Sequence, residues 1–141
     1  HEVVEATVGI IPVCPRYLDE FSFSVHDGLT DEQLIETCAH ELCHFLWFEK
    51  WKMLYPECSR EEYESPYVVW QYSEAVVDPI LKASGIKEIF NSNNTFSYDS
   101  FYENYDNLMN ELTDIYLSDL DIDTRINEGF NYYRKITSQK R

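Results

Sequence analysis

The chain has 141 residues, a formal net charge of −15 at pH 7, 16% aromatic side chains and few glycines or prolines. This length fits a single domain, residues 1–141, with a modest core, and the scarcity of turn residues argues against an all-β fold. The negative charge excludes nucleic acid as an expected partner, because nucleic-acid binding needs a basic surface, and no apolar run approaches the roughly 18 residues of a membrane-spanning helix, so we expect no membrane partner either.

The spacing of the four cysteines bears on the cellular compartment of the protein. Cys14, Cys38, Cys43 and Cys58 show no Cys-x-x-Cys spacing, which is typical of reduced, buried thiols and predicts a cytoplasmic protein. A bridge between Cys14 and Cys58 is the alternative for an exported protein. No secretory signal is visible, but the chain begins at His1 rather than Met, so we expect a processed or truncated N-terminus, which leaves export open.

Two β-strands are predicted near the N-terminus. Residues 3–11 are rich in β-branched side chains, and residues 21–25 alternate between apolar and polar, which indicates a strand with one buried face. Asp27-Gly28 reads as the turn that follows. We interpret His26 as an ordinary loop histidine, with contact to a substrate as the alternative.

A long helix is predicted from about Asp31 to about Trp51. Thr30 and Gln33 fit a capping box, and acidic residues occupy the first turn, where the helix dipole favours negative charge. Apolar residues then recur at helical spacing. Pro56 is expected to stop the helix at or before the preceding residue.

This helix contains the sequence His40-Glu41-Leu42-Cys43-His44, which reads His-Glu-x-x-His. Histidines four residues apart project from one helix face, about 6 Å apart along the axis, so both rings can bind one zinc ion at about 2.0–2.1 Å. Glu41 lies about 100° further round the helix, where a general base can reach a metal-bound water. The alternative is a pair of structural histidines, which would leave buried polar groups short of partners at about 1–3 kcal/mol each.

A catalytic zinc usually has three protein ligands and one open position. The other histidines are His1 and His26, neither downstream of the motif, so we expect a carboxylate from a later helix as the third ligand. Glu74 is the preferred candidate, because it lies in a largely apolar segment where a buried carboxylate needs a strong partner. The alternatives are that Glu74 is a surface residue, or that the ligand is one of the acids Glu57, Glu61, Glu62, Glu64 and Asp78.

The helix that carries Glu74 is predicted to have Ser65 as its N-cap and Pro66 as its first residue. Asp78 follows one turn after Glu74, where it can accept a hydrogen bond from the far nitrogen of a metal-bound histidine. Pro79 is expected to kink or end the helix, and Gly85 to cap any continuation.

Two more helices are predicted towards the C-terminus. Apolar residues recur at helical spacing from Asp99 to Ile115, and a final helix is expected from about Asp123 to Ile136. With the two N-terminal strands, these elements predict an α+β fold that is mostly helical, with no repeats and no second domain.

The residues of the motif, together with Ser-Glu-Ala-Val-Val-Asp at 73–78, resemble the gluzincins, the thermolysin-like HExxH…E zinc metallopeptidases. The short chain is most similar to their minimal single-domain members, the minigluzincins. The resemblance covers about residues 21–85 and is specific at five positions, which are His40, Glu41, His44, Glu74 and Asp78. It implies Zn²⁺ as cofactor, a peptide or protein substrate, and a zincin-like fold in which a small sheet precedes an active-site helix and a glutamate helix, followed by C-terminal helices.

Gluzincins also use a Tyr or His to stabilise the oxyanion of the tetrahedral intermediate, and no motif identifies this donor here. The candidates are Tyr55, Tyr72, Tyr102 and Tyr105, of which we select Tyr102 and Tyr105.

The predicted function is zinc-dependent peptide hydrolysis by a metal-activated water, with Glu41 as general base. One alternative is a gluzincin-like regulatory metalloprotein that acts on one dedicated partner, as the partners of phage and stress repressors do. The other is a non-catalytic acidic interaction module. An intact Glu41 favours catalysis, because a purely structural metal site has no need of it.

Overall fold

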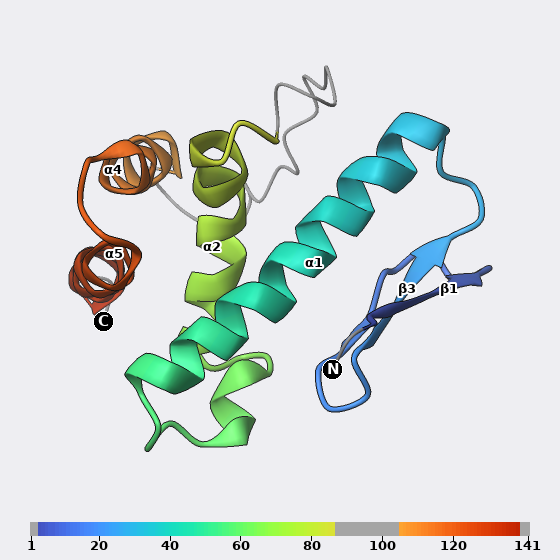
Figure 1. The fold of residues 1–141 in the computed structure, drawn as a ribbon, viewed down its shortest axis with the longest axis horizontal. Coiled ribbons are helices and arrows are strands. Elements are labelled where there is room, and N and C mark those ends of the chain that lie inside the picture. Colours follow the sequence, from blue (N-terminus) through green and yellow to red (C-terminus); the bar gives the residue numbers. More distant parts are fainter. Residues whose placement is uncertain (1–2, 87–104, 139–141) are drawn as a thin grey trace.

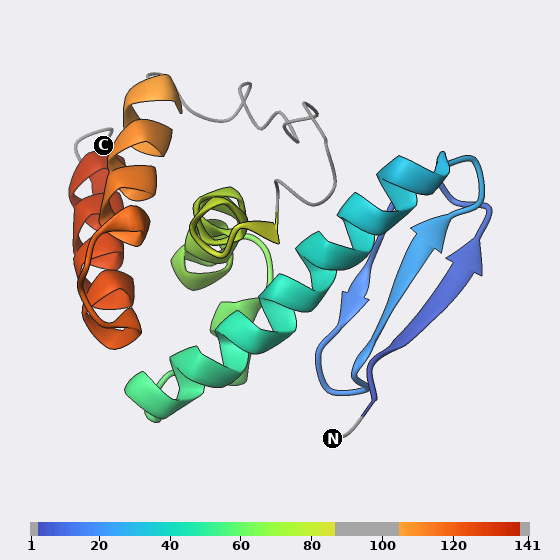
Figure 2. The ribbon, with the colours of Figure 1, turned by 45° about the horizontal axis from the view of Figure 1, so that its top comes forward.

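The computed structural model describes residues 3–86 and 105–138. The fold is α+β and mostly helical, with a small three-stranded sheet ahead of the helices. Figures 1 and 2 show the order of the parts in space: the sheet, then the long first helix, then the second helix, then the two C-terminal helices.

The sheet contains β1 (Glu5–Gly9), β2 (Arg16–Tyr17) and β3 (Ser22–His26), in the order β1-β3-β2. The central strand β3 runs parallel to β1 and antiparallel to β2. Phe23 and Val25 are buried while their neighbours in β3 are only half-buried, which confirms the predicted one-sided strand. The strand predicted over 3–11 is shorter in the structure, and the two-residue β2 was not predicted, because it is too short to show an alternating pattern.

The helix α1 (Asp31–Leu54) is confirmed and extends three residues beyond its predicted end at Trp51. Both bonds of the predicted capping box form: the side chain of Thr30 accepts from the backbone N–H of Gln33 at 3.3 Å, and the Gln33 side chain accepts from the backbone N–H of Thr30 at 3.0 Å. The ring of Phe45 lies against the sheet, with its centroid 6.4 Å from that of Phe23. This contact fixes α1 on the buried face of the sheet.

The helix α2 (Val68–Ala83) differs from its prediction at both ends. It follows a short 3-10 helix, η1 (Arg60–Tyr63), and a turn in which the N–H of Tyr67 bonds to the carbonyl of Glu64 at 3.0 Å. This turn uses Ser65 and Pro66, joined by a cis peptide, so the helix begins later than predicted and Tyr67 is its N-cap.

Pro79 does not end α2. It lies inside the helix and is fully buried, and four helical residues follow it, although proline removes one backbone hydrogen bond. Gly85 follows the helix with φ of 71°, and its N–H bonds to the carbonyl of Lys82 at 3.2 Å. The predicted glycine cap is therefore confirmed at this left-handed position.

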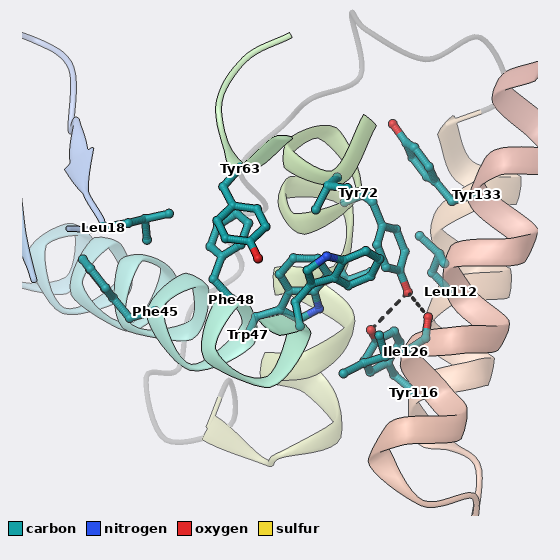
Figure 3. Close-up of a cluster of buried hydrophobic side chains, with 14 of the residues drawn as sticks. Leu18, Phe45, Trp47, Phe48, Tyr63, Tyr72, Leu112, Tyr116, Ile126 and Tyr133 are labelled. Atoms are coloured by element: carbon teal, nitrogen blue, oxygen red, sulfur yellow. Dashed lines mark hydrogen bonds between the residues drawn. The ribbon is translucent and has the colours of Figure 1, made fainter. Parts of the chain in front are cut away.

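The C-terminal helices are α4 (Tyr105–Leu117) and α5 (Ile122–Ser138), and they pack together on the far side of α2 (Figure 2). The predicted start of the first of these, at 99–104, lies outside the described residues. Figure 3 shows how Tyr72 of α2 joins them: its buried hydroxyl is 3.2 Å from the hydroxyl of Tyr116 and donates to the carbonyl of Ile126 at 3.2 Å. Stacked Trp47 and Trp51 of α1 complete this core.

All four cysteines are free thiols, so the alternative bridge between Cys14 and Cys58 does not form. The prediction of buried thiols holds only for Cys43, since the other three are partly exposed. In the described ranges, no helix combines the length and the apolar character needed to cross a membrane.

Candidate metal centre

The motif histidines and Glu74 meet where α1 lies against α2. The two Nε2 atoms of His40 and His44 are 3.0 Å apart. Oε2 of Glu74 is 3.5 Å from Nε2 of His40 and 3.2 Å from Nε2 of His44. The three residues thus bring together three donor atoms from two helices, and among the described residues they are the group of acids, histidines and cysteines arranged to hold a metal ion.

The separations between these donor atoms fit a zinc ion. Ligand atoms bound tetrahedrally at about 2.0–2.1 Å are about 3.3 Å from one another. The observed separations of 3.0, 3.2 and 3.5 Å bracket this value. Two imidazole nitrogens and one carboxylate oxygen are also a donor set that catalytic zinc uses, with a fourth position left for water. The residues present therefore fit the cofactor implied by the resemblance.

Burial and neighbouring charges give two of these side chains the protonation states that a metal ligand needs. His44 is fully buried, and this burial, helped by the nearby charge of Arg16, lowers its pKa to about 3. The ring is therefore neutral near pH 7, as a metal ligand must be. Burial raises the pKa of Glu74, but hydrogen bonds from both histidines and the charge of Arg16 lower it by more, so this carboxyl stays ionised.

Glu41 lies beside this group without belonging to it. The residue is 6% exposed, and Oε2 of its carboxylate accepts a hydrogen bond from Nη1 of Arg16 at 2.9 Å. Burial raises the pKa of Glu41, and the charges of Arg16 and His40 offset only part of that rise. A carboxylate with a raised pKa is better matched to accept a proton near neutral pH, which is the property a general base needs.

Arg16 of β2 is the site residue that sequence analysis missed. Its Nη2 donates to Oε1 of Glu74 at 3.1 Å, so one guanidinium pairs with both buried carboxylates. No motif marks this position. The one available signal is that Arg16 is the only Lys or Arg before Lys50 in a strongly acidic chain. Such an isolated cation is a candidate partner for the buried acids of the same segment.

The remaining candidates have different outcomes. Asp78 is half-buried on α2, one turn after Glu74. Since Nδ1 of His44 is buried and makes no hydrogen bond, only His40 remains as the histidine that Asp78 can orient, and that role stays a prediction. Among the alternative ligands, neither Asp78 nor any acid of the polar loop joins the three-residue donor group.

The predicted oxyanion donors are not placed in the site. Tyr102 lies outside the described residues, and Tyr105 begins α4 with a side chain that is likewise outside them, so both stay predictions. The other two candidates are used elsewhere. Tyr72 is fully buried in the core, and the hydroxyl of Tyr55, just after the end of α1, bonds to Asn127 of α5.

Comparisons of the chain with known protein families, with characterised proteins and with solved structures gave no match. The functional assignment therefore depends on the chemistry and geometry of the residues themselves.

Proposed function

We propose that the protein is a gluzincin-like zinc metallopeptidase that hydrolyses peptide bonds. The observation that carries this proposal is the convergence of His40, His44 and Glu74 at separations that suit one tetrahedral zinc ion. The buried Glu41 beside them supports catalysis over a purely structural site, which would not need a base.

His40, His44 and Glu74 would hold the zinc ion, and the neutral state of His44 keeps its nitrogen available for this role. Bound there, zinc would supply a water of lowered pKa, near 7, and would polarise the scissile carbonyl. Glu41 would serve as the general base for the attacking water and would return the proton to the leaving amine. Asp78 acts by orienting His40 through its outer ring nitrogen.

The order of elements supports a zincin-like architecture as part of this proposal. A small sheet precedes the motif helix α1, the glutamate helix α2 crosses it, and α4 and α5 follow (Figure 1). The net charge of −15 favours basic peptides as substrates, because opposite charge raises the rate of encounter.

Removal of the metal tests this function directly. The protein loaded with one equivalent of zinc is expected to cleave members of a mixed peptide library, and a chelator is expected to abolish cleavage until zinc is restored. The digest is read by mass spectrometry. Cleavage that continues unchanged after elemental analysis shows the metal to be gone would contradict the proposal.

A further inference from the structure

Arg16 contacts both buried carboxylates of the metal centre with a single guanidinium. Nη1 donates to Oε2 of Glu41 at 2.9 Å, and Nη2 donates to Oε1 of Glu74 at 3.1 Å. The second oxygen of Glu74 faces the two imidazoles, whereas Glu41 is not a member of the donor group. Both acids therefore pair with the same guanidinium group, but of the two only Glu74 faces the position that a metal ion would take.

The guanidinium is held in place by its surroundings. Arg16 pairs with Phe23 across the sheet, and the carbonyl of Pro15 accepts a hydrogen bond from the backbone N–H of Ser24 at 2.9 Å. Its Cζ lies 5.8 Å from the centroid of the buried Phe48 ring, and the side chain is only 10% exposed. A planar fork fixed in this way can bind two carboxylates in set directions, which a flexible ammonium group cannot do.

A divalent cation attracts any free carboxylate within reach, and Glu41 follows His40 directly on the same helix. If Glu41 bound the metal, it would fill the fourth position that a catalytic zinc keeps open for water. Its carboxylate would then be unavailable as a base. In the structure Glu41 is outside the donor group, and its carboxylate is bonded to Arg16.

We propose that Arg16 is a positioning residue that holds Glu41 off the metal and leaves Glu74 as the single carboxylate ligand. The role assigned to Arg16 depends on the proposed zinc site, although it can be tested without measuring catalysis. Because the guanidinium is positive, it also repels the cation, so its loss is not expected to weaken metal binding.

The test uses cobalt(II) in place of zinc, since the visible absorption of cobalt(II) depends on which atoms bind the ion. Arg16→Gln is expected to change this absorption, because Glu41 takes the fourth position in place of water. Zinc affinity is expected to equal or exceed that of wild type, while peptide hydrolysis falls by about 100-fold or more, the range for loss of a general base. Arg60→Gln is the matched control, because Arg60 also pairs with two acids, Asp19 and Glu64, but in a solvent-exposed position.

A double variant identifies the carboxylate responsible. In Arg16→Gln/Glu41→Gln, the freed acid is absent, so the cobalt(II) spectrum is expected to return to the wild-type form. If Arg16→Gln does not fold, Arg16→Lys replaces it, with a smaller change in the same direction, because a flexible ammonium group holds both acids less rigidly than the planar guanidinium does.

Three results would overturn the role of Arg16. The first is an unchanged cobalt(II) spectrum in Arg16→Gln, and the second is a spectral change that persists in the double variant. The third is a loss of zinc affinity of roughly tenfold or more in Arg16→Gln, which is expected for a residue that merely supports a ligand. These readings need no substrate. If the wild-type protein binds zinc but cleaves no peptide, the peptidase proposal is wrong. The cobalt(II) spectra would still decide whether Arg16 positions Glu41.

Discussion

Glu74→Ala is expected to lower the zinc affinity of the protein by more than about 100-fold, beyond the roughly 10- to 100-fold that outer-shell partners contribute. The reason is that, among the described residues, Oε2 of Glu74 is the carboxylate oxygen that faces both imidazoles, at 3.2 and 3.5 Å. Without it, two imidazole nitrogens remain, and no other carboxylate of the described residues belongs to the donor group to offset the charge of the ion. Competition with a chromophoric zinc chelator measures the affinity.

The matched control for this variant is Glu64→Ala. Glu64 was also a candidate ligand, but its side chain is exposed and pairs with Arg60 at 2.7 Å. Its removal is expected to leave zinc affinity unchanged. Stoichiometric, undiminished zinc binding by Glu74→Ala would show that α2 does not supply the third ligand.

Glu41→Gln is expected to lower peptide hydrolysis by about 10²- to 10⁴-fold while the protein keeps one equivalent of zinc. The amide has nearly the same shape as the carboxylate but cannot accept the proton of the attacking water. Because Glu41 lies outside the donor group, metal binding should survive the substitution. Initial rates of cleavage and the zinc content of the same sample provide the measurement.

Glu49→Gln is the control on the same helix, since Glu49 is an exposed residue of α1 that pairs with Lys52. It should retain the wild-type rate. A Glu41→Gln variant that cleaves peptides as fast as this control would assign the base to another residue, and a variant that loses its zinc would make Glu41 a ligand.

The features predicted most closely from the sequence are those with strong local causes. The capping box at Thr30 depends only on residues within one turn of each other, and it is found in the structure. The apolar face of α1 is found only in part, because Phe45 and Trp47 are buried whereas Leu42 and Leu46 are exposed. The positions of His40 and His44 follow from the same periodicity. Glu74 could be selected because a carboxylate in an apolar helix needs a partner, and the structure places it beside both rings.

Contacts between distant segments could not be predicted in this way. Arg16 reaches Glu41 and Glu74 across 25 and 58 residues of sequence, and β2, which carries it, has only two residues. The start of α2 differs from its prediction for a local reason. Ser65 and Pro66 are residue types that often begin helices, but in the structure they are the central residues of the turn from Glu64 to Tyr67.

The central claim is that one zinc ion is bound jointly by His40, His44 and Glu74. A crystal of the protein grown with one equivalent of zinc, measured at wavelengths on either side of the zinc absorption edge, locates the ion without reference to activity. The account predicts one anomalous peak, about 2 Å from Nε2 of each histidine and from Oε2 of Glu74. An anomalous peak that lies beyond bonding distance of both histidines, or one zinc ion per chain bound elsewhere, would contradict it.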